Sequence, residues 1–160
     1  MSCQPGDAGL FSLTVEYAMR AVLALAGGDG TPMTTKQIAQ TMKVPQSYLS
    51  KVLQSLVRGG LVFSTRGLNG GFVLTRSPDQ LSMLDIMNAV SPIKRIESCP
   101  LDLESHSSDL CPLHRRLDEA MAQVQDAFAS ITLAEILSEN NPCPTMQKQL
   151  ASLKPLKDLT

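Results

Sequence analysis

The sequence predicts a mainly α-helical protein with one small β-hairpin, arranged as a winged helix-turn-helix that is followed by a long helix. Three observations support this fold class. Two short segments with apolar residues at helical spacing are joined by about three residues, two β-prone runs follow them directly, and a longer helical stripe lies in the last third of the chain. The 160 residues, 43% of them hydrophobic, are enough for one compact domain, or for a small domain with an oligomerisation arm.

The first two predicted helices have recognisable start signals. Apolar residues recur at helical spacing over 15–26, with Ser12 or Thr14 as the N-cap and glycines directly after the last of them. The second helix starts after Thr34, because this residue and Gln37 have the spacing of a capping box.

The third predicted helix begins at Pro45, since a proline suits the first turn of a helix and interrupts the helix before it. Its apolar stripe covers 49–56, and the helix stops at Gly59. The second and third helices together form the predicted helix-turn-helix.

Two β-prone runs, 61–66 and 72–76, flank the glycine-rich segment 67–71 and predict a hairpin. A hairpin that directly follows a helix-turn-helix is a wing. Because only 4% of the residues are aromatic, we expect Phe63 and Phe72 to lie in the core rather than to form a base-stacking platform. Recognition of single-stranded RNA is therefore disfavoured.

Further along the chain, two more capping boxes predict short helices, one after Ser82 and one after Thr132. Between them, 91–110 reads as a loop that contains prolines and serines. A long helix follows this loop. Its apolar stripe consists of Leu113, Leu117, Ala120, Met121, Val124 and Phe128.

These elements suggest four parts. A winged helix-turn-helix domain covers 11–90, a cysteine-bearing loop covers 91–112, the long helix and the short helix after it cover 113–138, and a loosely ordered tail covers 139–160.

The net charge of −1 conceals a strong asymmetry. The segment 30–78 contains no Asp or Glu and carries +6, so the remainder carries −7. A basic segment of this length is typical of a surface that faces phosphates, although a chance cluster on a solvated face would look the same. The basic residues are Lys36, Lys43, Lys51, Arg58, Arg66 and Arg76.

A helix-turn-helix places the N-terminal residues of its second helix at the base edges of the major groove. The candidate base-reading residues are therefore Gln46, Ser47, Ser50 and Lys51. Candidates for contacts with the flanking DNA backbone are Lys36, Lys43, Tyr48 and Arg58. In the wing, Arg66 is a candidate for the minor groove, and Asn69 lies in a tip without bulky side chains that would obstruct the approach of DNA.

Other classes of protein are disfavoured. No apolar run approaches the roughly 20 residues of a membrane span, and no charged segment with an apolar core resembles a secretory signal, so we expect a cytoplasmic protein. Phosphate-loop, zinc-protease and dinucleotide-binding motifs are absent from the sequence. Cys111 and His114 have the spacing of a nucleophile and its base, but no third residue is evident to orient the base, and we predict that the protein is not an enzyme.

Three segments resemble the Rrf2 family of bacterial transcription regulators, which includes IscR-type and NsrR-type sensors. They are 15–20 (VEYAMR), 58–62 (RGGLV) and, most specifically, the wing 66–74 (RGLNGGFVL). The similarity extends over 11–137. The resemblance implies a homodimer built on the long helix, so that this helix is a dimerisation helix. It also implies an iron-sulfur cluster in the cysteine-bearing loop that controls affinity for DNA.

Cluster-binding members of that family carry three cysteines spaced six apart, and the IscR type adds a histidine three residues later. Here Cys99 and Cys111 match the outer cysteines, His114 matches the histidine, and Ser105 stands at the middle position. His106 is a candidate for the missing ligand. By the same resemblance, an acidic residue of the first helix completes the cluster from the other subunit, and Glu16 is in the matching position; an acid in an amphipathic helix is also commonly salt-bridged.

The residues themselves also indicate metal or redox chemistry. Cys111 and His114 lie one turn apart at a helix N-terminus, which favours the thiolate that metals bind. Two irons need about two ligands each, so Cys99, Cys111 and His114 with His106 or Glu16 favour a [2Fe-2S] over a [4Fe-4S] cluster. A zinc site with two cysteines and two histidines, and a disulfide between Cys99 and Cys111, remain alternatives. Cys3 and Cys143 have no predicted role.

The leading hypothesis is thus a dimeric regulator, for example a repressor, that binds double-stranded DNA at a pseudo-palindromic operator and responds to a cluster or to the thiol state of the loop. The alternative is a metal- or zinc-binding winged-helix protein that acts through electron transfer or protein contacts. The two differ in salt dependence, because only phosphate neutralisation makes binding to duplex DNA weaken steeply as salt rises.

Overall fold

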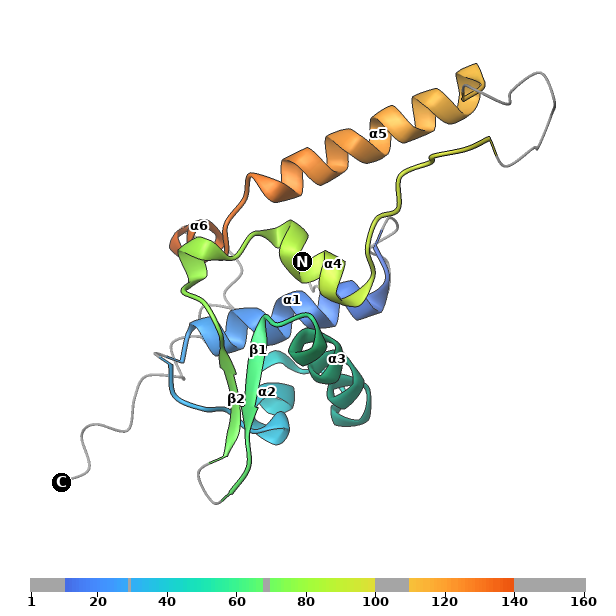
Figure 1. Cartoon of the computed structure of the whole chain (residues 1–160). Helices are drawn as coiled ribbons and strands as arrows, with labels where there is room; N and C mark the ends of the chain where they lie inside the picture. The colour runs from blue at the N-terminus through green and yellow to red at the C-terminus, as the bar shows by residue number, and fades with distance from the viewer. Residues whose placement is uncertain (1–10, 29, 68–69, 100–109, 140–160) are drawn as a thin grey trace.

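The computed structural model describes residues 11–28, 30–67, 70–99 and 110–139 (Figure 1). The elements in chain order are α1 (Leu13–Ala26), α2 (Thr35–Met42), α3 (Gln46–Arg58), β1 (Val62–Thr65), β2 (Gly71–Leu74), a 3-10 turn (Pro78–Gln80), α4 (Met83–Val90), α5 (Pro112–Ala129) and α6 (Leu133–Ser138). The predicted fold class, mainly helical with a small two-stranded sheet, is confirmed. The predicted tail from 140 onward lies outside the described residues.

The three capping boxes read from the sequence are in place. Thr34, Ser82 and Thr132 each accept a hydrogen bond from the backbone N–H three residues later, and each receives the reciprocal side-chain bond of a capping box. Ser12, not Thr14, is the N-cap residue of α1, and its side chain makes no capping bond. These caps satisfy backbone donors that helix starts otherwise leave unpaired.

The core lies around α1, which packs against α2, α3 and α4. Its fully buried side chains come from every element of the helix-turn-helix and from the segments after the wing. Among the largest are Ile38, Leu49, Leu53, Leu56, Leu81 and Ile86. The apolar stripe of α3 therefore faces inward, and this orientation leaves its polar face on the outside of the molecule.

The hairpin pairs β1 with β2 in antiparallel register, from Val62 opposite Leu74 to Thr65 opposite Gly71. Met33 pairs with β2 in a separate antiparallel bridge, because its backbone N–H and C=O both bond to Phe72, at 3.1 and 2.8 Å. The prediction that Phe63 lies in the core is wrong. Successive strand residues point to opposite faces, so Val62 is buried and Phe63 is 58% exposed, whereas Phe72 packs against the core.

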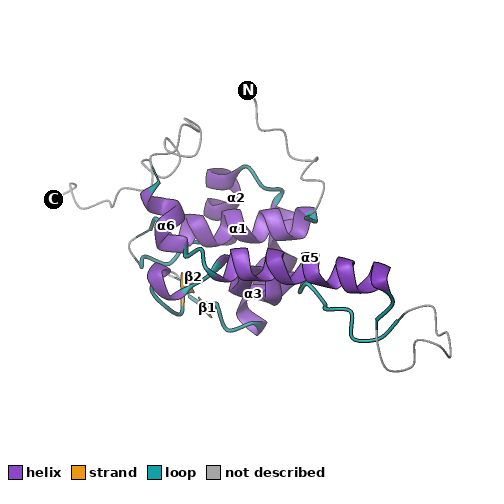
Figure 2. Ribbon diagram, turned by 90° about the horizontal axis from the view of Figure 1, so that it is seen from above, coloured by secondary structure: helices purple, strands orange, loops and turns teal. Residues whose placement is uncertain are grey.

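Helix α5 extends beyond the rest of the molecule (Figure 1). It contains no buried residue, and Leu113 and Leu117 of its apolar stripe are 63% and 45% exposed. Its C-terminal end is anchored, because Phe128 meets Phe11 edge to face and the next segment bonds back to the body through Leu133 N–H and Leu81 O, 2.8 Å apart. Seen from above, α5 runs in nearly the same direction as α1 and reaches further out at one end (Figure 2). Among the described helices, none is long and apolar enough to cross a membrane.

Candidate functional site

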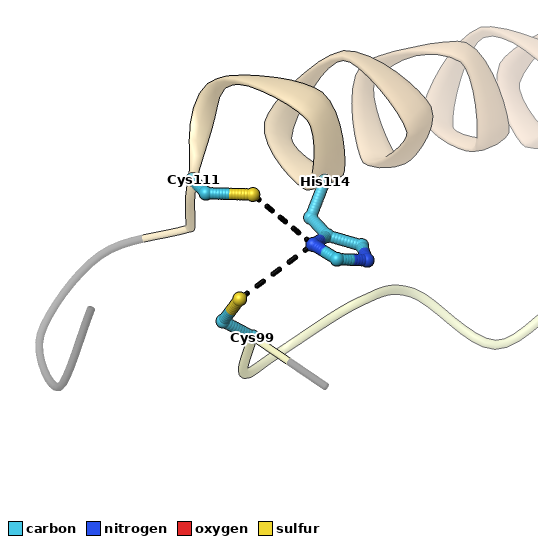
Figure 3. Close-up of side chains that lie close together, drawn as sticks. All are labelled: Cys99, Cys111 and His114. Atoms are coloured by element: carbon cyan, nitrogen blue, oxygen red, sulfur yellow. Dashed lines mark hydrogen bonds between the residues drawn. The ribbon is translucent and has the colours of Figure 1, made fainter. Parts of the chain in front are cut away.

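Two cysteines and a histidine converge at the outer end of α5. Cys111 is the N-cap residue of α5, His114 lies in its first turn, and Cys99 ends the described segment that leads out from α4 (Figure 3). The Nδ1 atom of His114 lies 3.1 Å from Sγ of Cys111 and 3.6 Å from Sγ of Cys99. One ligand atom from each residue lies within 4.8 Å of the others. We call these three residues the Cys/His group.

The electrostatics of the Cys/His group favour a thiolate. The backbone amide of His114 lowers the pKa of the Cys111 thiol, and the Cys99 side chain and the Leu113 amide act in the same direction against the opposing effect of burial. The cause is general, because the unpaired N–H groups at a helix N-terminus stabilise negative charge. Thiolates are the form of cysteine that binds metals and attacks disulfides.

The donor set of the Cys/His group fits a metal centre. Ligands at about 2.0 to 2.3 Å from a tetrahedral metal lie roughly 3.3 to 3.8 Å from one another. Here the two sulfurs lie 3.1 and 3.6 Å from the imidazole nitrogen, and all three donor atoms lie within 4.8 Å of one another. Two sulfurs and one imidazole nitrogen are ligands that zinc and iron accept. Three donors leave one position for another ligand.

The other predicted ligands are not part of this group. His106, like Ser105, lies outside the described residues, as do Cys3 and Cys143. Glu16 lies on α1 and forms an ion pair with Arg20, which also donates to the backbone oxygen of Met42 at 3.3 Å. Within its own chain, Glu16 is therefore salt-bridged and is not gathered with the Cys/His group.

Sequence reasoning missed the side chains of Arg95, Asp118 and Gln125, which hold the segment that leads to Cys99 against α5. Arg95 donates from Nε to Oδ1 of Asp118 at 2.6 Å, and a second guanidinium nitrogen bonds the other carboxylate oxygen. The backbone N–H of Ile96 also donates to Oδ1 of Asp118, at 2.9 Å. Further along α5, Gln125 donates to the backbone oxygen of Ile93 at 2.9 Å. One signal was available, because Cys111, Asp118 and Gln125 are spaced seven residues apart and so share one face of a helix.

The candidate DNA-reading residues lie on the outer face of α3. Gln46, Ser47, Ser50 and Lys51 are all exposed, opposite the buried stripe. The hydroxyl of Ser50 donates to the backbone oxygen of Gln46 at 3.1 Å, within the helix. Tyr48 is half exposed, and its hydroxyl bonds to that of Thr14 on α1.

The basic residues of the predicted DNA surface are exposed as well. Lys36, Lys43 and Arg58 lie on the helix-turn-helix and Arg66 on the hairpin, while Asn69 lies outside the described residues. The ion pairs found among the described residues involve other arginines, so these side chains have no carboxylate partner there. An open groove between α3 and the hairpin brings both arginines together and adds polar residues that sequence reasoning missed. It is lined by Gln54, Val57, Arg58, Ser64, Arg66 and Phe72.

Residues 11–139 match the family model Rrf2, which is described as an iron-dependent transcriptional regulator. Relatives of known name agree with this match. A protein of Aquifex aeolicus named as an HTH-type transcriptional regulator is 30% identical over 132 residues, which cover 81% of this chain and 92% of the relative. A similar regulator of Azotobacter vinelandii is 27% identical over 126 residues, covering 78% and 77%.

Solved structures show the same fold. CymR, the global cysteine regulator of B. subtilis, superposes with a TM-score of 0.66 at 32% identity and covers 82% of this chain and 98% of its own. IscR of T. potens superposes with a TM-score of 0.67 at 26% identity, covering 85% and 92%. The oxidized form of CymR from Staphylococcus aureus gives a TM-score of 0.61 at 25% identity, covering 81% and 97%.

Proposed function

Because the chain belongs to the Rrf2 family of transcriptional regulators, we propose that it is a homodimeric regulator whose affinity for its operator is set by an iron-sulfur cluster at the Cys/His group. The observation that carries this proposal is the convergence of Cys99, Cys111 and His114 at the end of a helix that the winged-helix body does not bury. As a regulator of transcription it would act in the cytoplasm, and we infer no catalytic role.

The DNA-binding part of the proposal rests on shape and charge. The exposed polar face of α3 carries residue types that can read a major groove, and Arg66 on the hairpin lines the same groove as residues of α3. Phosphate contacts from Lys36, Lys43 and Arg58 would set the register without reading sequence.

The dimer part rests on α5. A helix with exposed leucines and no buried residue in its own chain is stabilised when a second apolar surface covers it. Two copies related by a two-fold axis would present two recognition helices. Their operator would be pseudo-palindromic, with half-sites separated by about one helical turn or a multiple of it.

For the cofactor we favour a [2Fe-2S] cluster held by Cys99, Cys111 and His114, with the remaining ligand from His106 or from Glu16 of the partner subunit. When bound, such a cluster supplies one-electron redox chemistry, and an imidazole ligand in place of a thiolate raises its reduction potential. These residues would hold the cluster at the outer end of α5, where Cys111 is buried and His114 is half-buried.

The first experiment measures the visible spectrum of protein purified without oxygen, with iron and sulfide counted per chain. We expect a brown protein with matching iron and sulfide, and loss of both in Cys99→Ser, Cys111→Ser and His114→Ala. Cys143→Ser is the matched control and should keep the colour. A colourless wild type that takes up no iron on reconstitution would refute cluster binding.

The DNA-binding part has its own test. Affinity for operator duplex should fall steeply as salt rises, and Lys36→Ala, Lys51→Ala and Arg66→Ala should each weaken binding and reduce the salt slope by about 1. Lys94→Ala, an exposed cation on the segment beside α5, is the control and should leave the slope unchanged. Intact binding in all three variants would show that the recognition surface is elsewhere.

A thiol switch is the second candidate, because both sulfurs of the Cys/His group approach the same imidazole nitrogen. In this reaction a disulfide oxidant accepts two electrons and two protons as Cys99 and Cys111 join their sulfurs. A metal-free protein whose DNA affinity changes on oxidation, and not in Cys99→Ser, would favour it. Zinc bound tightly and without redox response would instead make the group structural.

A further inference from the structure

The segment 91–99 runs beside α5 and in the opposite direction, from α4 out to the Cys/His group (Figure 1). Contacts join the two at three levels. Ile93 is held by Gln125, Arg95 and Ile96 are held by Asp118, and Cys99 meets Cys111 and His114. The segment has no regular secondary structure of its own, so these contacts decide where it lies.

The spacing of these levels follows a simple rule. Along the segment the contacts recur every three residues, at Ile93, Ile96 and Cys99, whereas along α5 they recur every seven, at Gln125, Asp118 and Cys111. Three extended residues span about 10 Å, and seven helical residues span about 10.5 Å. The two repeats therefore match, and each contact supports the next in one register.

We propose that Asp118 is the positioning residue of the Cys/His group: it fixes the register of 93–99 against α5 and so places Cys99 opposite Cys111 and His114. As a statement about metal binding this rests on the proposed function, but the placement of the two sulfurs does not depend on any metal.

Asp118 makes the strongest contacts between the segment and α5. Its two carboxylate oxygens accept hydrogen bonds from two nitrogens of the Arg95 guanidinium and from the backbone amide of Ile96. Charge-assisted hydrogen bonds of this kind are roughly twice as strong as neutral ones. Its side chain is only 15% exposed, so water competes little for the carboxylate. The bond from Gln125 to Ile93 is neutral and single, and it adds less restraint.

The consequence for the site is geometric. A slip of one residue along this segment moves each side chain by about 3.3 Å along α5. Cys99 would then leave the cluster of donor atoms, while Cys111 and His114 would stay together because α5 alone sets their spacing. Loss of Asp118 is thus expected to convert a three-donor group into a two-donor group.

The test compares Asp118→Ala with Glu119→Ala in the full chain, with Cys3 and Cys143 replaced by serine so that two thiols remain. Glu119 is the adjacent carboxylate, but among the described residues its ion pair is with Arg116, on the exposed side of α5. Titration with Co²⁺, followed through thiolate-to-cobalt absorption, should give at least a tenfold weaker affinity for Asp118→Ala and a value within twofold of wild type for Glu119→Ala.

A second readout needs no metal. In a glutathione buffer, two protein thiols and one glutathione disulfide give one Cys99–Cys111 disulfide and two glutathione thiols, and the equilibrium constant reports how often the sulfurs meet. We expect it to fall at least tenfold in Asp118→Ala. If wild type binds no Co²⁺, the metal-binding function fails, while this equilibrium still tests the placement.

Arg95→Gln is a second variant in case Asp118→Ala does not fold, since Arg95 is 44% exposed and its loss leaves no buried gap. It should lower both quantities in the same direction. Folded Asp118→Ala protein with both its Co²⁺ affinity and its disulfide equilibrium within twofold of wild type would overturn the proposal, and a tenfold fall in either quantity would support it.

Discussion

The hydroxyl oxygens of Tyr48 and Thr14 lie 2.8 Å apart and join the first turn of α3 to the first turn of α1. The ring of Tyr48 also meets Tyr17 edge to face, with ring centroids 5.5 Å apart. Sequence reasoning assigned Tyr48 to the DNA backbone, and that role stays a prediction. In the free protein the side chain holds α3 against α1.

A double-mutant cycle tests this bond. Tyr48→Phe and Thr14→Val each remove one hydroxyl and keep the ring or the branched shape, so each should lower the free energy of unfolding by about 0.5 to 1 kcal/mol. The double variant should lose less than the sum, with a coupling of about 0.5 kcal/mol. Urea unfolding measures all four proteins, and strictly additive losses would show that the hydroxyls do not interact in solution.

Gly71 is expected to be intolerant of any side chain. A Cβ at this position would lie 2.8 Å from the backbone of Met33, which pairs with Phe72 in the hairpin. Gly71→Ala should therefore destabilise the protein by about 1 to 3 kcal/mol, as overpacking against backbone does. Gly28→Ala is the matched control, because its Cβ would meet nothing closer than 3.6 Å. Thermal unfolding that ranks the two variants equally would contradict the close approach.

Replacing Lys43 by glycine should raise the stability of the fold and lower the affinity for DNA. It ends α2 with φ of 53°, a left-handed conformation that costs a non-glycine residue roughly 1 to 2 kcal/mol. Part of the gain from glycine is offset by the greater freedom of the unfolded chain, so Lys43→Gly should stabilise the fold by about 0.5 to 1 kcal/mol. The same change should weaken operator binding and lower the salt slope by about 1.

Lys43→Ala separates the two effects. Alanine removes the same charge but keeps a Cβ in the left-handed conformation, so DNA affinity should fall as in Lys43→Gly without the gain in stability. Equal stability of the glycine and alanine variants would count against strain at this turn.

Asp118 should make stability depend on pH in the acid range. The Arg95 side chain, with help from the Ile96 amide, lowers the pKa of Asp118 from 3.8 to about 2. Because the folded pKa is lower than the unfolded one, the stabilisation is fully present above pH 4 and is lost as the pH falls toward 2. The difference in unfolding free energy between wild type and Asp118→Asn should therefore shrink over that interval. A difference that stays constant from pH 5 to pH 2 would contradict the ion pair.

Much of the fold was predictable because its signals are local. Thr34 and Gln37 form a capping box and predict a helix start from four consecutive residues. The apolar stripe from Leu49 to Leu56 predicts the buried face of α3 without knowledge of the helices that cover it. Cys99, Cys111 and His114 were likewise identified by residue type and spacing. Their convergence follows from α5 and from the segment beside it.

The features that sequence reasoning missed depend on partners distant in the chain. Met33 pairs with Phe72 across thirty-nine positions of sequence, and Arg95 pairs with Asp118 across twenty-three. The prediction for Phe63 was wrong because strand alternation only divides the residues between two faces of the hairpin. Tertiary packing decides which of the two faces is covered. Aromatic residues are usually inside, yet here the face that carries Phe63 has no covering layer in the described chain.

Ser82 and Thr132 pair in an isolated bridge, so the chain leaves the winged-helix body and returns to it at one point. In terms of chain statistics, residues 83–131 form one excursion from the body, and this bridge holds its two ends together. Each doubling of the length of such a loop costs only about 0.6 kcal/mol. A change in the length of this excursion is therefore expected to cost the winged-helix body little stability.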